Sequence, residues 1–243
     1  MNVKLTIEYD GTNYHGWQVQ PNRKTIQEIL ETAIETVLGA KTRVRAGGRT
    51  DAGVHALGQV ANFICSDDID PLRLQRGLNA LTPEDIVVKK TEIAPDSFDA
   101  RRDARSRIYQ YRIWNYPWPS AFHRCFSWHI PYPLNLSVMQ ASIRFLEGEH
   151  DFASFQAADC DAIHSVRRIY RTSLGMEDGV LVYTVEATAY LRHMVRNIVG
   201  TLVELGRVEQ TPEAFVRILE ARDRTQAGPT APAHGLFLME IKY

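Results

Sequence analysis

The order of the expected secondary-structure elements constrains the fold of this chain more than any other feature of its sequence. Apolar alternation, helical periodicity and turn residues predict, in chain order, a strand, a helix, two strands, a helix and a strand, at residues 3–10, 25–39, 42–46, 58–65, 71–81 and 85–93. The order β-α-β-β-α-β is that of a split, ferredoxin-like unit.

The helix at residues 25–39 has the strongest pattern in this part of the chain. Its apolar residues recur with the spacing of one helical face, at Ile26, Ile29, Leu30, Ala33, Ile34, Val37 and Leu38. Thr25 and Glu28 have the spacing of a capping box, and Gly39 is suited to the left-handed residue that ends a helix.

The second half repeats this order loosely. We expect a strand, a helix, a hairpin around the sequence EDG, two further helices and a closing strand, at residues 107–115, 136–148, 168–176, 180–189, 191–206, 211–222 and 235–243. The predicted fold is therefore α+β, with two ferredoxin-like halves, 1–103 and 104–243, whose sheets join into one mostly antiparallel sheet with a central cleft.

Composition excludes several classes of protein. No apolar run approaches the ~20 residues of a membrane span, and no signal peptide is evident, so we expect a cytoplasmic protein without a membrane segment. The three cysteines are far apart and are interpreted as reduced thiols. The net charge is −1, but arginines cluster at residues 101–107 and 167–171. Such clusters either contact nucleic acid or form solvated faces with local ion pairs.

The stretch AGGRTDAGVHA, residues 46–56, contains almost nothing that can pack in a core. Its glycines Gly47, Gly48 and Gly53 favour a turn between two strands. The stretch lacks the pattern of a phosphate-binding loop. Arg49 next to Asp51 favours an ionised carboxylate, and the pair is either a structural ion pair or part of a functional site.

Two further elements carry candidate functional residues. Strand alternation places Arg107, Tyr109 and Tyr111 on one face, where a tyrosine either packs in the core or contacts a ligand. In the helix at 191–206, Arg192, Arg196 and Gly200 share a face, which is either solvated or functional. Near the N-terminus, Tyr14 and Trp17 suit either a core or an RNA contact. No histidine pattern has metal-ligand spacing, so we expect no metal.

Five blocks of the sequence, in order, resemble the tRNA pseudouridine synthase A family. They are YDGTNYHGWQVQ, GGRTDAGVHALGQVANF, FDARRDARSRIYQYRI, RHMVRNIVGTL and PTAPAHGLFL, at residues 9–20, 47–63, 98–113, 192–202 and 229–238. This resemblance implies an isomerase that converts uridine to pseudouridine at positions 38, 39 and 40 of the tRNA anticodon stem-loop. It also implies a homodimer and, because the reaction is redox-neutral, no cofactor.

The resemblance also assigns roles to residues. Asp51 takes the place of the catalytic aspartate, which attacks either C6 of the uracil or C1′ of the ribose, and Arg49 and Arg196 are the candidates for keeping it ionised. Tyr109 packs against the flipped-out uracil or acts as an acid or base at C5. We expect Arg107 and Gly48 to contact the substrate as well.

Two other functions remain open at this level. A non-catalytic RNA-binding module needs only the ferredoxin-like halves and the arginine clusters. A retaining glycosidase with Asp51 as nucleophile needs a second carboxylate as general acid, for which Asp99 and Asp103 are the candidates.

Overall fold

The chain folds into two units, which are described separately. The computed structural model describes residues 1–65, 69–160, 162–208 and 210–243. Unit 1 comprises residues 1–107 together with 237–243, and unit 2 comprises residues 108–236. This division differs from the expected halves in one main respect, because the closing strand belongs to unit 1 and not to the second half.

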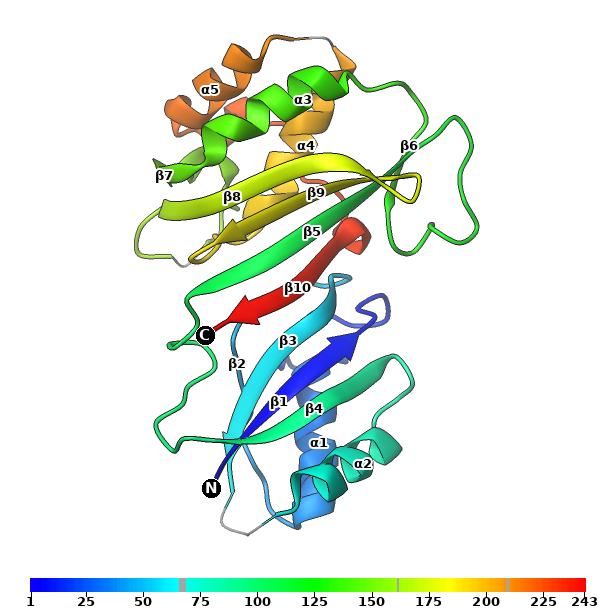
Figure 1. Ribbon diagram of the computed structural model, residues 1–243, viewed down its shortest axis with the longest axis vertical. Coiled ribbons are helices and arrows are strands. Elements are labelled where there is room, and N and C mark those ends of the chain that lie inside the picture. The colour runs from blue at the N-terminus through cyan, green and yellow to red at the C-terminus, as the bar shows by residue number, and fades with distance from the viewer. Residues whose placement is uncertain (66–68, 161, 209) are drawn as a thin grey trace. The chain divides into compact units, whose positions relative to one another are not determined.

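The elements of unit 1 follow the predicted β-α-β-β-α-β order. They are β1 (Asn2–Tyr9), α1 (Ile26–Leu38), β2 (Arg45–Ala46), β3 (His55–Ile64), α2 (Pro71–Leu81) and β4 (Ile86–Ala94), and β10 (Leu236–Lys242) is added from the end of the chain. Figure 1 shows α1 and α2 side by side on one face of the sheet, and the two helices contact each other.

The sheet of unit 1 has the order β4-β1-β3, with two strands sharing the outer edge of β3. Strand β3 is antiparallel to β2, with Arg45 opposite Asn62. It is parallel to β10, with Phe237 opposite His55. Of the strand expected at 42–46, only the last two residues, Arg45 and Ala46, pair with β3.

Alternation along β1 builds the core of unit 1. Val3, Leu5 and Ile7 are fully buried, and Leu30 and Ile34 of α1 are also fully buried. At ~25 cal/mol per Å² of apolar surface, each such side chain stabilises the fold by about 1.5–3 kcal/mol. The apolar periodicity of the sequence thus identified the elements that form this core.

The predicted capping box of α1 is wrong. The side chain of Thr25 makes no capping hydrogen bond, and it is fully buried. The first amides of the helix instead donate to backbone carbonyls of the preceding loop, from Ile26 to Gly16 at 3.2 Å and from Gln27 to Trp17 at 3.0 Å. The predicted end is confirmed, because Gly39 has the left-handed conformation, with φ 71°.

Unit 2 contains a sheet of order β5-β9-β8-β7. Its elements are β5 (Ser106–Asn115, of which the first two residues belong to unit 1), β6 (Trp128–Ile130), α3 (Leu136–Ile143), η1 (Arg144–Leu146), β7 (Gly148–Asp151), η2 (Ala153–Phe155), β8 (Val166–Glu177), β9 (Val180–Ala187), α4 (Met194–Arg207), α5 (Pro212–Ala221), η3 (Arg224–Gln226) and η4 (Ala233–Gly235). Helices α3, α4 and α5 contact one another (Figure 1).

The hairpin predicted around EDG is confirmed. Asp178 and Gly179 both have positive φ, 48° and 82°, as a tight hairpin turn requires. The helix expected at 136–148 ends early, and α4 begins only at Met194, because His193 is left-handed with φ 61°. Strands β6 and β7 were not predicted, since three and four residues are too few to show alternation.

The α+β class and the mostly antiparallel strand pairing are confirmed by the sheets of the two units. The pairs β1–β3, β1–β4, β2–β3, β7–β8 and β8–β9 are antiparallel, and the pairs β10–β3 and β5–β6 are parallel. None of the helices formed by the described residues has the length and apolar character that crossing a membrane requires.

Candidate active site

The 47–54 loop connects β2 to β3, and its first residue is fixed on both sides. The Gly47 amide donates to the Val60 carbonyl at 2.8 Å. The Gly47 carbonyl accepts two hydrogen bonds from Arg107, at 2.8 Å from Nη2 and 3.1 Å from Nε. A Cβ at residue 47 would lie 2.8 Å from the Ala100 carbonyl oxygen, so a larger residue cannot enter without displacing backbone.

Asp51 lies in this loop with a partly exposed side chain, and Arg49 is exposed. Between them Thr50 is only 7% exposed, and its hydroxyl is hydrogen bonded to the Tyr9 hydroxyl at 2.7 Å. The Trp17 amide donates to the Thr50 carbonyl at 3.0 Å. The buried Thr50 therefore fixes the backbone that carries Asp51, which is itself partly exposed.

The chain between β1 and α1 packs directly against the loop. Gly16 has φ 83°, and a Cβ there would lie 2.5 Å from the Thr50 carbonyl oxygen. The Gly53 amide donates to the Tyr14 carbonyl at 3.2 Å. Tyr14 and Trp17 are 3% and 2% exposed, so of the two interpretations left open by the sequence, the core interpretation holds.

Arg107 and Gly48 take part in holding the loop. Besides Gly47, Arg107 donates to the carbonyls of Arg101 at 2.9 Å and Ala104 at 3.3 Å. The Gly48 carbonyl accepts from Gln59 Nε2 at 2.8 Å. The structure thus gives both residues a positioning role, and their expected contact with substrate stays a prediction.

Tyr109 lies on β5 in unit 2, with 8% of its surface exposed. Its ring meets the ring of Tyr190 edge to face, with centroids 4.9 Å apart and an interplanar angle of 80°. Tyr190 is itself fixed, because its hydroxyl donates to the Val185 carbonyl at 2.9 Å. Burial raises the pKa of Tyr190 well above its ordinary value, so this neighbour is uncharged at neutral pH.

Arg196 projects from α4, where a segment that we call the strap, residues 228–232, lies against the helix. Its Nε donates to the Ala231 carbonyl at 2.8 Å, and the Ala231 amide donates back to the Arg196 carbonyl at 3.1 Å. Gly200 lets the strap approach, since a Cβ there would overlap the Pro229 carbonyl oxygen. The face shared by Arg196 and Gly200 is therefore covered by backbone. Arg192 lies before the start of α4, so the expected helical face does not include it; it is exposed and paired with Asp159.

The strap also fixes Tyr111. The Tyr111 hydroxyl donates to the Pro232 carbonyl at 2.7 Å, and Gly235 lies against its ring. Burial raises the pKa of Tyr111 strongly, and the positive charge of Arg196 opposes this shift. Arg196 and Tyr111 are thus electrostatic neighbours, and Tyr111 is a core residue.

Asn197 is a site-supporting residue that the sequence reasoning missed. It is fully buried, its Nδ2 donates to the Phe155 carbonyl at 2.8 Å, and its Oδ1 accepts from the Thr230 hydroxyl at 2.7 Å and from Arg224 Nη2 at 3.2 Å. These bonds connect α4 to η2 and to the strap next to Arg196. The available signal was an amide within the apolar run MVRNIVGTL, because a buried amide needs partners.

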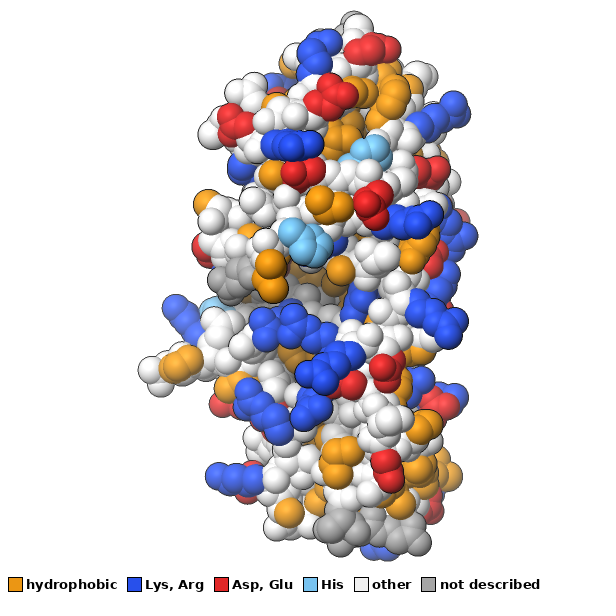
Figure 2. Space-filling view, turned by 90° about the vertical axis from the view of Figure 1, so that its left-hand side faces the viewer, with side chains coloured by type: hydrophobic (Ala, Val, Ile, Leu, Met, Phe, Trp, Pro, Cys, Tyr) orange, Lys and Arg blue, Asp and Glu red, His pale blue; other side chains and the backbone are white. Residues whose placement is uncertain are grey.

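The arginine clusters divide between the two interpretations that the sequence left open. In the cluster at 167–171, Arg171 forms an ion pair with Glu186, as solvated faces do. Arg101, Arg102 and Arg105 are exposed. Figure 2 shows Lys and Arg side chains on one face of the molecule, with acidic side chains among them. The cluster at 101–107 therefore contains the better candidates for phosphate contacts.

The described residues contain no group of three or more His, Cys, Asp or Glu side chains arranged to hold a metal ion. The arrangement in unit 1 offers a single carboxylate on a fixed loop. The arrangement in unit 2 offers a nearly buried aromatic ring and a guanidinium held by backbone. These are groups for nucleophilic attack, for stacking and for charge stabilisation.

Comparison with known proteins identifies the family of the chain. A family model described as tRNA pseudouridine synthase matches residues 5–102 and 143–243. The chain belongs to this family. The matched stretches contain Gly48, Arg49, Asp51 and Arg196, whereas Arg107 and Tyr109 lie between them.

Similar curated proteins share one name within this family. A tRNA pseudouridine synthase A of Pelobacter propionicus is 44% identical over 99% of both chains. The protein of the same name from Geotalea uraniireducens is 45% identical over 99% of both chains. That of Myxococcus xanthus is 45% identical over 99% of this chain and 91% of its own.

Among solved structures, a chain described under "Crystal Structure of a Cbf5-Nop10-Gar1 Complex" aligns with 12% identity and a TM-score of 0.33. The alignment covers 82% of this chain and 53% of that chain. This likeness is too weak to carry an argument about the fold.

Proposed function

We propose that this protein isomerises uridine to pseudouridine in tRNA, at positions 38, 39 and 40 of the anticodon stem-loop, with Asp51 as the nucleophile. The observation that carries the proposal is the fixed position of Asp51: its neighbour Thr50 is buried and hydrogen bonded, while Asp51 stays accessible. Membership of the tRNA pseudouridine synthase family supplies the reaction.

The reaction conserves atoms and electrons. The N1–C1′ bond of the target uridine breaks, the uracil turns, and C5 bonds to C1′; C5 then loses its proton and N1 gains one. Asp51 adds to C6 or C1′ and is released at the end, so neither cofactor nor co-reactant is required by the balance. A carboxylate is ionised at neutral pH and needs no general base to attack.

The other groups assist this step. Tyr109 supplies a ring against which an unstacked uracil regains stacking, and Tyr190 keeps that ring in place. Arg196, held by Ala231, supplies positive charge that favours an ionised nucleophile, and exposed Arg49 does the same from the loop. Arg107 fixes the loop through Gly47, and the small Gly48 leaves room for substrate to approach.

The test of this proposal is tritium release from tRNA that carries C5-tritiated uridine, followed by mapping of pseudouridine in the product. We expect release by the wild type and a loss of at least ~10³-fold in Asp51→Asn, as for removal of other nucleophiles. Binding of tRNA by Asp51→Asn should stay close to that of the wild type.

Each alternative has its own outcome. A non-catalytic RNA-binding module would bind tRNA and release no tritium from the wild type. A hydrolase would release free uracil. Full activity in Asp51→Asn would remove Asp51 from the role of nucleophile.

We also propose that the protein acts in the cytoplasm as a homodimer, as the family resemblance implies. Sedimentation of the purified protein across a range of concentrations tests the dimer. A species of one chain's mass at every concentration would contradict it.

A further inference from the structure

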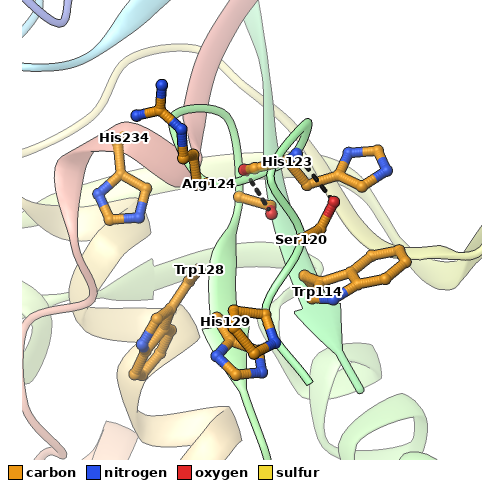
Figure 3. Close-up of a pocket in the computed structure, with 9 residues that line it drawn as sticks. Trp114, Ser120, His123, Arg124, Trp128, His129 and His234 are labelled. Carbon is orange, nitrogen blue, oxygen red and sulfur yellow. Dashed lines mark hydrogen bonds between the residues drawn. The ribbon is translucent and has the colours of Figure 1, made fainter. Parts of the chain in front are cut away.

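Unit 2 contains a pocket of about 240 Å³ for which the proposed reaction has no use. It lies between the end of β5, the loop of residues 116–127 and η4, and its walls include Trp114, His123, Arg124, Trp128, His129 and His234 (Figure 3). All of these except His234 lie outside the stretches matched by the family model. Its volume is below the ~300 Å³ at which pockets for drug-sized ligands begin, which suits a single planar group.

The 116–127 loop is ordered by hydrogen bonds. Trp114 Nε1 donates to the Trp118 carbonyl at 2.9 Å, and His129 Nε2 lies 2.8 Å from the Tyr116 carbonyl. The Ser127 hydroxyl donates to the His123 carbonyl at 2.9 Å. These bonds keep the pocket open without a ligand, so a ligand would not bear the entropy cost of ordering the loop.

Stacked rings form one side of the pocket. The ring of Trp114 stacks with that of Tyr116, 4.9 Å away at 17°, and with that of His123, 4.7 Å away at 24°. Phe122, on the same loop, is 90% exposed. Aromatic faces that continue a stack are the common platform for unpaired nucleobases in proteins.

The charge of the region favours an anionic ligand. Residues 114–135 contain no Asp or Glu, and their one arginine, Arg124, is exposed at the pocket. Burial lowers the pKa of His234, a backbone hydrogen bond with Ser127 partly opposes this shift, and the charge of Arg196 adds to it, so the imidazole is neutral at neutral pH. The lining therefore combines π faces, one fixed cation and a neutral hydrogen-bonding ring.

We propose that this pocket binds one unpaired nucleobase of the substrate RNA, other than the reacting uridine, with the base against the aromatic wall and its phosphate at Arg124. The inference rests on the proposed function for the identity of the ligand as RNA. A protein partner would also cover exposed aromatic residues, but it gives no reason for an acid-free cationic pocket with room for one ring.

The probe for the test is a short oligouridylate, titrated into Asp51→Asn while tryptophan fluorescence is followed. We expect quenching that is reduced in Trp114→Phe, in which Trp128 is the remaining tryptophan of the lining, and kept in full in the control Trp118→Phe, since Trp118 does not line the pocket. Affinity should fall several-fold in Trp114→Phe, because the smaller ring stacks less extensively and cannot donate to the Trp118 carbonyl. Arg124→Gln should reduce the salt slope of binding by about one, whereas the exposed control Arg144→Gln should not.

Steady-state kinetics with anticodon stem-loop RNA provide a second measurement. In the otherwise wild-type enzyme, Arg124→Gln should raise KM several-fold and leave kcat unchanged, because the reacting uridine is bound elsewhere. Equal oligouridylate affinity of Trp114→Phe, Arg124→Gln and the parent would overturn the proposal. So would a change in sedimentation of Phe122→Ala without a change in RNA binding, which would make the loop a protein interface.

Failure of the pocket and failure of the proposed function are distinguishable. Oligouridylate binding that depends on Trp114 and Arg124, together with no pseudouridine formation, would support the pocket and contradict the isomerase. Pseudouridine formation by the wild type, together with normal oligouridylate binding by Trp114→Phe and Arg124→Gln, would support the isomerase and contradict the pocket.

Discussion

The hydroxyls of Tyr9 and Thr50 are hydrogen bonded 2.7 Å apart in the buried core of unit 1, and Asp51 is the next residue. The bond joins the end of β1 to the 47–54 loop. Asp51, the proposed nucleophile, is therefore positioned by a strand far from it in sequence.

Replacing Tyr9 with Phe should impair catalysis without preventing folding. The change leaves the Thr50 hydroxyl without this partner and should cost about 1–3 kcal/mol in the free energy of unfolding. A small displacement of Asp51 should lower kcat on the order of tenfold. Denaturant unfolding and tritium release measure the two effects. Tyr170→Phe, at a half-exposed ring, is the control and should change neither.

The same tyrosine makes stability depend on alkaline pH. Burial raises the pKa of Tyr9 to about 12, against 10.0 for the ordinary group. The unfolded chain therefore ionises first, and the contribution of Tyr9 is complete below about pH 10 and is lost as the pH rises toward 12. Between these values, Tyr9→Phe should show a shallower loss of the free energy of unfolding than the wild type. A decline as steep as that of the wild type would argue against the buried position.

Gly16→Ala should cost more than Gly39→Ala, although both glycines have positive φ, 83° and 71°. The left-handed conformation costs each variant about 1–2 kcal/mol. At Gly16 the Cβ also meets the Thr50 carbonyl, whereas nothing lies within 4 Å at Gly39. We expect Gly16→Ala to lose most of its kcat and Gly39→Ala to keep it. Equal activity of the two variants would mean that the contact with the loop is unimportant.

Gly200→Ala should displace the strap from α4 and with it the carbonyl that holds Arg196. Overpacking of this kind costs about 1–3 kcal/mol. In a chain of this size each kcal/mol lowers Tm by roughly 2–4 °C. Gly175→Ala is the matched control, because a Cβ at this position in β8 has nothing within 4 Å. The Tm from thermal unfolding and kcat should both fall in Gly200→Ala. A Tm of Gly200→Ala equal to that of Gly175→Ala would contradict the packing argument.

Much of the fold could be predicted from local patterns. The helix at 26–38 with its terminal glycine, the hairpin at Asp178 and Gly179, and the element order of unit 1 all follow from periodicity and turn residues. The capping box of Thr25 failed because the carbonyls of Gly16 and Trp17 reach the same amides. The residues of the cap do not indicate that the loop containing Gly16 and Trp17 folds back against the start of the helix.

The candidate site, like the fold, was only partly predictable from the sequence. Asp51, Tyr109 and Arg196 became candidates through the family resemblance of the sequence, because ordered motifs identify residue types at their positions. Only the tertiary structure showed that Arg107 holds the Gly47 carbonyl, that Gly200 admits the strap and that β10 pairs with β3. These relationships join residues far apart in the chain, and they depend on which backbone groups meet after folding. A one-dimensional pattern reports the face on which a side chain lies, but not the partner that it meets there.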